Sequence, residues 1–126
     1  MHTCLTYFYV DTSKSINFDV QKFAETLGLD SANYNVMQNG NIRIGENNNY
    51  NVDVNAMARD TLCCVWDKQA MLVDLANNYN LTYYLVRVPH VYANCDLPKP
   101  ILSLNADVVA FLQQTGTIDD LDYYVY

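Results

Sequence analysis

The sequence LTYYLVRVPHVY at residues 81–92 carries the strongest strand signal in the chain. β-Branched and aromatic residues fill it, which predicts a β-strand. Both faces of this strand are apolar near its middle, which is typical of a central strand that is covered on both sides at least locally. Pro89 has no backbone N–H, so we expect ladder pairing to stop or to bulge there.

A helix is predicted on each side of this strand. Residues 67–79 precede the strand, and Asp67 is a candidate N-cap for their helix. The helix that follows the strand starts near residue 104 and ends near Gly116. In both segments the apolar residues repeat at helical spacing, so that one side of each helix faces a core. These apolar residues are Met71, Leu72, Leu75 and Tyr79 in the first segment, and Leu104, Val108, Phe111 and Leu112 in the second.

Two further helices are predicted in the first half of the chain. Residues 18–27 show a clear apolar stripe, with Asn17 as the candidate N-cap and Gly28 as the residue that ends the helix. Residues 54–65 also show helical spacing, and Asp53 is the candidate N-cap. For residues 61–66, TLCCVW, local propensity leaves a strand open as the alternative.

The remaining segments of the first half predict strands and hairpins. Residues 4–10 are β-branched and aromatic, which predicts a strand. Asn39 and Gly40 predict a type I′ turn between strands at residues 34–37 and 41–44, because both central residues of that turn need a positive φ. Residues 45–49 predict a second turn, which leads into a strand at residues 50–53.

The carboxyl-terminal residues 118–126, IDDLDYYVY, alternate in polarity and predict a last strand. Its odd-numbered side chains are expected to face the core, and its even-numbered side chains to face the opposite way. The odd-numbered ones are Leu121, Tyr123 and Val125, and the even-numbered ones are Asp120, Asp122, Tyr124 and Tyr126. Together the segments predict one α+β domain over residues 1–126, with a largely antiparallel sheet and about four helices packed on it.

The charge of the chain argues against nucleic-acid binding. Fourteen acidic and seven basic residues give a net charge of −7, and the basic residues are scattered singly. Nucleic-acid binders normally carry a basic patch, whereas a basic protein is the better electrostatic complement of this chain. No apolar run approaches the roughly 18 residues of a membrane span, and no signal peptide is visible, so a cytoplasmic location is expected.

No residue pattern in the chain indicates catalysis, a metal or a cofactor. The four cysteines lack the spacing of zinc ligands, and reduced, mostly buried thiols are expected. His2 and His90 are the only histidines, and neither belongs to a nucleophile motif. The cysteines are Cys4, Cys63, Cys64 and Cys95.

The aspartates near the carboxyl terminus are the most distinctive polar feature of the chain. No basic residue follows Lys99, while Asp107, Asp119, Asp120 and Asp122 all lie beyond it. These carboxylates form a solvated strand face, or a hydrolytic or ligand-binding site, or a protein-binding face. Interleaved tyrosines favour protein binding among the functional alternatives, because tyrosine supplies rigid contact area at interfaces. The proposed partner-binding residues are Asp107, Asp119, Asp120, Asp122, Tyr124 and Tyr126. Tyr83, Tyr84 and Tyr92 either extend this face or belong to the core.

The second half of the chain resembles a known bacterial family. The segments MLVDLA at 71–76, LTYYLV at 81–86, LSLNADVVAFL at 102–112 and IDDLDYY at 118–124, with Gly116 between the last two, are similar to the family called domain of unknown function 4279. The resemblance mainly concerns residues 71–126, and the first half is compatible with it. It implies no catalytic residue, since none is established for the family.

In character, small acidic bacterial proteins of this kind resemble the immunity proteins of contact-dependent and other polymorphic toxin systems. That analogy implies a cytoplasmic protein that is not an enzyme. Its partner is expected to be a cognate protein toxin, basic and of the nuclease type. A small-ligand-binding or hydrolytic protein that uses Asp119, Asp120 and Asp122 is one alternative. A homo-oligomeric structural module is another.

Overall fold

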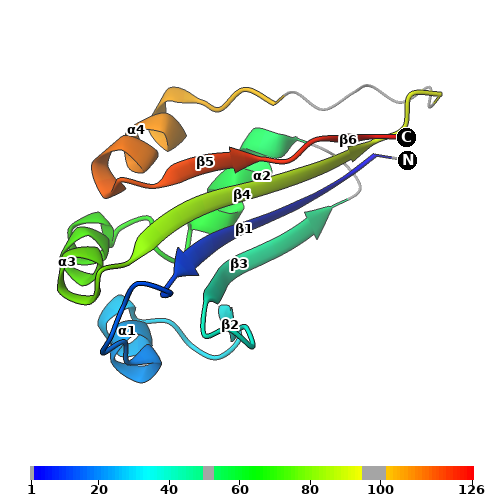
Figure 1. Cartoon of the computed structure of the whole chain (residues 1–126). Coiled ribbons are helices and arrows are strands. Elements are labelled where there is room, and N and C mark those ends of the chain that lie inside the picture. The colour runs from blue at the N-terminus through cyan, green and yellow to red at the C-terminus, as the bar shows by residue number, and fades with distance from the viewer. Residues whose placement is uncertain (1, 50–52, 95–101) are drawn as a thin grey trace.

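The computed structural model describes residues 2–49, 53–94 and 102–126, and a sheet forms its centre (Figure 1). Strand β4 (Thr82–Val91) has neighbours on both sides. It pairs antiparallel with β1 (Thr3–Asp11) and parallel with β5 (Ile118–Leu121) and β6 (Tyr124–Val125). The predicted central position of residues 81–92 is therefore confirmed.

The sheet continues beyond β1 through two more antiparallel strands. β3 (Ile42–Asn49) pairs with β1, and β2 (Tyr34–Val36) pairs with β3. The strand order is β2-β3-β1-β4-β5, and β6 also pairs with β4. Among the strands that the structure describes, only the contacts of β5 and β6 with β4 are parallel, so the predicted α+β class with a largely antiparallel sheet is confirmed.

The helices pack on one face of this sheet (Figure 1). They are α1 (Val20–Leu27), α2 (Val54–Leu62), α3 (Gln69–Tyr79) and α4 (Ala106–Thr115). All four contribute to one core with alternate residues of the strands, such as Phe8 and Val10 of β1. The helices cover one face of β4, but Val86 on the opposite face is also buried, so the expected local covering of both sides is confirmed at the middle of the strand. The strand alternative for residues 61–66 is wrong, because α2 runs to Leu62 and turns follow it.

Two of the three predicted helix N-caps differ in the structure. The carboxylate of Asp19, rather than Asn17, accepts hydrogen bonds from the first backbone N–H groups of α1. Asp53 caps α2 as predicted, by accepting from the N–H of Ala56. Asp67 does not cap α3, whose N-cap is Lys68 without a side-chain hydrogen bond. Gly28 and Gly116 end α1 and α4 as predicted.

The hairpin between β2 and β3 is confirmed, but its turn type is not. Gly40 has a φ of 87°, whereas Asn39 does not have a positive φ, so the turn is not type I′. The Gly40 N–H donates to the carbonyl of Met37, and the Met37 N–H donates to the carbonyl of Asn41. This arrangement is typical of a turn that places a single left-handed residue at its end.

Gly45 lies inside β3, so the second turn predicted at residues 45–49 is wrong. Thr6 pairs with Asn47 and Phe8 pairs with Ile44, so β3 has one extra residue opposite β1. Gly45, with a φ of 64°, supplies the left-handed conformation that this bulge needs. Of the strand predicted at 50–53, residues 50–52 lie outside the described residues.

Pro89 interrupts pairing on one side of β4 only. The carbonyls of Arg87 and Val91 accept hydrogen bonds from the carboxyl-terminal segment. Pro89 lies midway between these two residues, and alternate residues of a strand direct their backbone groups to the same side, so the backbone of Pro89 also points toward β5 and β6. The missing N–H thus falls where β5 has ended and β6 has not yet begun. On the other side, β1 pairs past Pro89 without a break. The predicted interruption is confirmed on the side of β5 and β6.

Leu121 and Val125 lie on the core side of the sheet, as predicted, but the odd-numbered residues of the last segment are exposed rather than buried in the core. Leu121 and Tyr123 are each 40% exposed, and Val125 is 57% exposed. Leu121 lies beside Arg87 and Val125 beside Val91, and both of these β4 residues are buried. The helix layer therefore covers β4 but does not reach the edge strands.

No helix in residues 2–49, 53–94 and 102–126 has the length and apolarity needed to cross a membrane.

Candidate functional site

The sheet face opposite the helices, here called the open face, carries side chains from β1, β3, β4 and β5. Alternation along β1 buries its even-numbered residues under the helices and leaves Leu5, Tyr7 and Tyr9 half-buried on the open face. Strand pairing then sets Tyr9 beside Tyr84 and Tyr7 beside Val86. The polar and aromatic side chains of the open face include Tyr7, Tyr9, Arg43, Tyr84, His90 and Asp120.

Arg43, the one arginine among these open-face residues, packs against the ring of Tyr7. The Arg43 guanidinium carbon lies 4.1 Å from the centroid of the Tyr7 ring, and its Nη1 donates to Glu46 at 2.7 Å. Burial raises the pKa of Tyr7, while Arg43 opposes that rise and Asp120 adds a smaller increase. Because Arg43 is paired with Glu46, its positive charge is largely neutralised at this end of the open face.

A stack of four aromatic rings, the aromatic ladder, lies at the other end of the open face. It runs from Tyr124 through His90 and Tyr126 to Tyr92. The three distances between the centroids of neighbouring rings are 5.2, 5.7 and 5.2 Å, and the rings are close to parallel. The Tyr126 hydroxyl also lies 2.9 Å from Nδ1 of His90. These contacts fix the side chains of β6 against the end of β4.

Asp119 points toward the helix side of the sheet and is a structural residue. Its two carboxylate oxygens accept hydrogen bonds from Nε and Nη2 of Arg87 at 3.0 and 2.7 Å. Arg87 is only 3% exposed, and its Nη1 donates to the carbonyl of Leu102 at 2.6 Å. The pair joins β4, β5 and the segment before α4, so Asp119 does not belong to an acidic binding face.

Asp120 and Asp122 supply the remaining negative charge near the aromatic ladder. Asp120 lies beside Val86 on the open face, and Asp122 accepts a hydrogen bond from the Tyr124 hydroxyl at 3.0 Å. That bond raises the pKa of Tyr124, because the phenol has to keep its proton to donate it. Within the described residues neither carboxylate forms an ion pair.

Asp107 lies apart from these residues. It is exposed in the first turn of α4, and the residue before that helix, Asn105, donates its N–H to the side chain of Asn55 on α2. Asp107 therefore belongs to the helix layer rather than to the open face.

The structure also separates the three tyrosines whose placement the sequence left undecided. Tyr83 is buried in the core, whereas Tyr84 faces Tyr9 and Tyr92 belongs to the aromatic ladder. Tyr7 and Tyr9 belong to the open face but are absent from the sequence-predicted site. The alternation of residues 4–10 held a signal for them, since every second residue of that strand shares a face.

The thiols are less buried than expected. Cys4 is buried, Cys64 is half-buried and Cys63 is exposed, and none of the three is in a disulfide. Burial raises the pKa of Cys4, which keeps its thiol protonated. Cys95 lies outside the described residues. In the described part of the chain no three His, Cys, Asp or Glu side chains gather where they could hold a metal ion.

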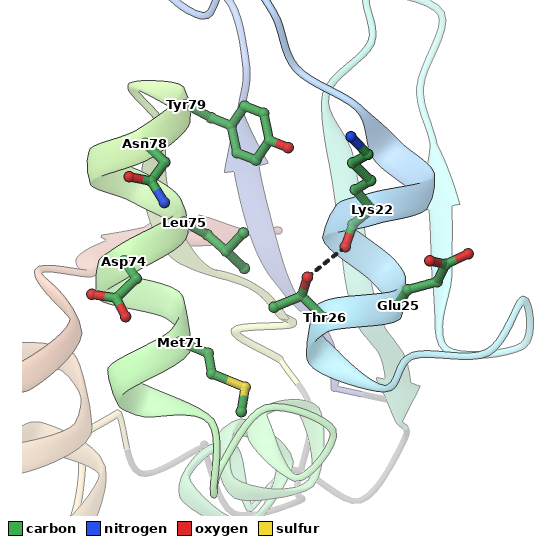
Figure 2. Close-up of a pocket in the computed structure, with 8 residues that line it drawn as sticks. All are labelled: Lys22, Glu25, Thr26, Met71, Asp74, Leu75, Asn78 and Tyr79. Atoms are coloured by element: carbon green, nitrogen blue, oxygen red, sulfur yellow. Dashed lines mark hydrogen bonds between the residues drawn. The ribbon is translucent and has the colours of Figure 1, made fainter.

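A groove of about 370 Å³ lies between α1 and α3 (Figure 2). Leu75, Met71 and Tyr79 of α3 reach toward α1, and charged residues such as Lys22 and Asp74 line it. Lys22 and Glu25 belong to α1 and Asp74 belongs to α3, and no ion pair joins their side chains in the described structure. None of the carboxyl-terminal aspartates lines this groove, so it gives no support to a ligand site built on them.

No protein-family model, curated protein or solved structure matches this chain. The resemblance to the domain of unknown function 4279 therefore stays a prediction.

Proposed function

We propose that this chain is a protein-binding domain of the immunity type, which neutralises a basic protein toxin by covering the toxin's active or substrate-binding surface. The observation that carries the proposal is the exposed, aromatic and acidic carboxyl-terminal segment, residues 118–126, together with the open face beside it. Of the binding residues predicted from the sequence, the proposal keeps Asp120, Asp122, Tyr124 and Tyr126. Asp119 and Asp107 are left out because of their structural positions.

The exposed apolar area of this segment supports protein binding. Six of its nine residues are large apolar or aromatic residues that are between 40% and 59% exposed: Ile118, Leu121, Tyr123, Tyr124, Val125 and Tyr126. Contiguous apolar patches on a protein surface mark interaction sites. Aromatic side chains that are already held in place lose little conformational entropy on binding, and the aromatic ladder holds two of these tyrosines.

The charge of the surface selects the class of partner. Glu46 and Asp119 are neutralised by Arg43 and Arg87, so Asp120 and Asp122 remain as carboxylates without an ion pair in the described structure. The chain as a whole carries a charge of −7. Opposite fields speed association and disfavour wrong partners, so a basic protein fits this surface and a phosphate backbone does not.

The proposal predicts that a basic toxin domain is encoded next to this chain's gene, and that domain is the partner used in the test. Co-expression with this chain is expected to restore growth of cells that make the toxin domain. The double variant Asp120→Lys/Asp122→Lys is expected to weaken the purified complex by about tenfold or more, because it places two cations against a basic partner. Asp107→Lys is the control on the helix layer, where it makes half of the double variant's change of charge, and the affinity of this variant for the toxin domain is expected to change less than about threefold.

Two results would contradict the proposal. One is a toxin domain that remains lethal in the presence of the chain. The other is an equal loss of affinity in the Asp107→Lys control and in the double variant, which would place the interface away from residues 118–126. Raising the salt concentration is expected to weaken the wild-type complex, mainly through a slower association rate.

A further inference from the structure

The strands β5 and β6 form one edge of the sheet, and their backbone is arranged to accept another strand. The N–H groups of Asp122 and Tyr126 donate to carbonyls of β4. Since backbone groups of alternate residues point to the same side, those of Leu121, Tyr123 and Val125 point away from β4. An edge strand with outward N–H and C=O groups is a template for an incoming strand.

We propose that the basic partner docks by adding one of its own β-strands to this edge, and that basic and apolar residues alternate along the added strand. This inference rests on the proposed function, because it takes its partner from there. Strand addition gives affinity through main-chain hydrogen bonds and specificity through alternate side chains.

The two sides of the edge differ in chemistry, and this difference defines the partner strand. On the open-face side the edge presents Asp120, Asp122 and the ring of Tyr124. On the other side it presents the exposed side chains of Leu121 and Val125. A strand placed beside it therefore meets carboxylates and an aromatic ring at every second residue, which suit lysine or arginine, and apolar side chains at the residues between.

The same charges disfavour a second copy of this chain as the occupant. Two copies paired through this edge would bring Asp120 and Asp122 of one copy close to the same carboxylates of the other, and like charges across a strand pair are destabilising. Inward or edge charges are a known means of preventing edge-to-edge association. The charges on this edge therefore disfavour pairing with a second copy of the chain but favour pairing with a basic strand.

The probe for this proposal is an acetylated octapeptide in which lysine and valine alternate. On titration, NMR is expected to show slowed hydrogen exchange at the amides of Leu121, Tyr123 and Val125, which gain carbonyl partners from the peptide. Two control peptides are expected to bind at least about tenfold more weakly. One has the same composition with the lysines and valines in two blocks, and in the other glutamate replaces lysine.

A backbone variant separates strand addition from side-chain contact. Leu121→Pro removes an outward N–H, which edge strands tolerate, whereas Leu121→Ala removes the side chain and keeps the N–H. Leu121→Pro is expected to weaken peptide binding about tenfold relative to Leu121→Ala. Thermal unfolding tests whether both variants fold. If Leu121→Pro does not fold, Val125→Pro, which removes another outward N–H, takes its place.

Several results would overturn strand addition. They are equal binding by the alternating and blocked peptides, equal binding by the proline and alanine variants, or sedimentation showing that the chain already dimerises through this edge. The co-expression assay keeps the two proposals apart. If the proline variant still neutralises the toxin domain but Asp120→Lys/Asp122→Lys does not, the immunity function stands and strand addition fails. If wild type gives no protection, the function itself fails.

Discussion

Arg87 shows how this fold accommodates a charge within its helix-covered face. The side chain is 3% exposed, yet each of its three guanidinium nitrogens donates to an oxygen of Asp119 or Leu102. Hydrogen bonds from all three nitrogens offset part of the cost of removing the guanidinium from water. From the sequence, Asp119 was predicted to belong to an acidic binding face, because no local pattern indicates its pairing with Arg87, 32 residues earlier.

Tyr83 gives a prediction at this scale for alkaline pH. Its hydroxyl donates to the Leu72 carbonyl at 2.7 Å, and burial raises its pKa well above the ordinary value of about 10. Below pH 10 both folded and unfolded chains keep this proton. Above it the unfolded chain loses the proton first, so the free energy of unfolding is expected to fall by about 1.4 kcal/mol per pH unit for this residue.

Urea denaturation between pH 8 and 12 measures this dependence. Tyr83→Phe is expected to be about 1 kcal/mol less stable at pH 8, because the buried Leu72 carbonyl loses its hydrogen bond. Its stability should then decline less steeply above pH 10 than that of the wild type. Tyr84→Phe serves as the control from the open face. An equally steep decline in Tyr83→Phe and wild type would contradict the assignment.

At the scale of elements, the contact between β3 and α2 depends on Gly45. A Cβ at this position would clash with the backbone carbonyl of Thr61 in α2, and the residue also has a positive φ. The strand bulge and the helix are therefore in direct contact through a residue without a side chain. From the sequence, a glycine after a short strand predicted a turn, because the approach of a helix 16 residues further on is not a local property.

Gly45→Ala is expected to lower the free energy of unfolding by about 3 kcal/mol or more, since it combines an unfavourable φ with a clash against backbone. Gly28→Ala is the matched control, because Gly28 has nearly the same φ of 66° but no heavy atom within 4 Å of an added Cβ. Its cost is expected to be about 1 kcal/mol, from the backbone conformation alone. Chemical denaturation measures both, and similar losses would disprove close contact of α2 with β3.

The helices illustrate which element-level features are local. All four follow from apolar residues at helical spacing, and three of them end at residues 27, 79 and 115, close to the predicted ends. Their starts were harder to predict, because Asn17 and Asp19 are both good N-cap residues and Asp67 precedes α3 by two positions. Which of several capping residues is used depends on the direction from which the chain enters the helix.

At the scale of the whole molecule, one core joins all the helices to the sheet. Phe8 of β1 contacts the rings of Tyr83 and Phe111, and Phe111 stacks on Trp66 with 5.2 Å between centroids. Because all four helices contribute to the same main cluster of buried residues, we expect a single cooperative unfolding transition. Trp66 fluorescence and far-ultraviolet circular dichroism are expected to give the same midpoint in urea. Separate midpoints would show that part of the chain unfolds independently.

The candidate surface was partly predictable from the sequence. The even-numbered residues Asp120, Asp122, Tyr124 and Tyr126 were predicted to share a side, and the strand pairs and ring contacts agree with this. His90, Tyr7 and Tyr9 were missed, because their place beside those residues depends on strand order. Asp107 was included because it is near in sequence, although α4 carries it to the helix layer.

The sequence by itself determined the α+β class, the central strand, the helix positions and the acidic charge of the chain. These features depend on side-chain periodicity, backbone propensity and composition, which are local or additive. Only the tertiary structure decided that the helices cover one face, that Arg87 binds Asp119, and that residues 118–126 form an exposed edge. Each of these depends on which distant segments lie side by side, and the register between strands sets that.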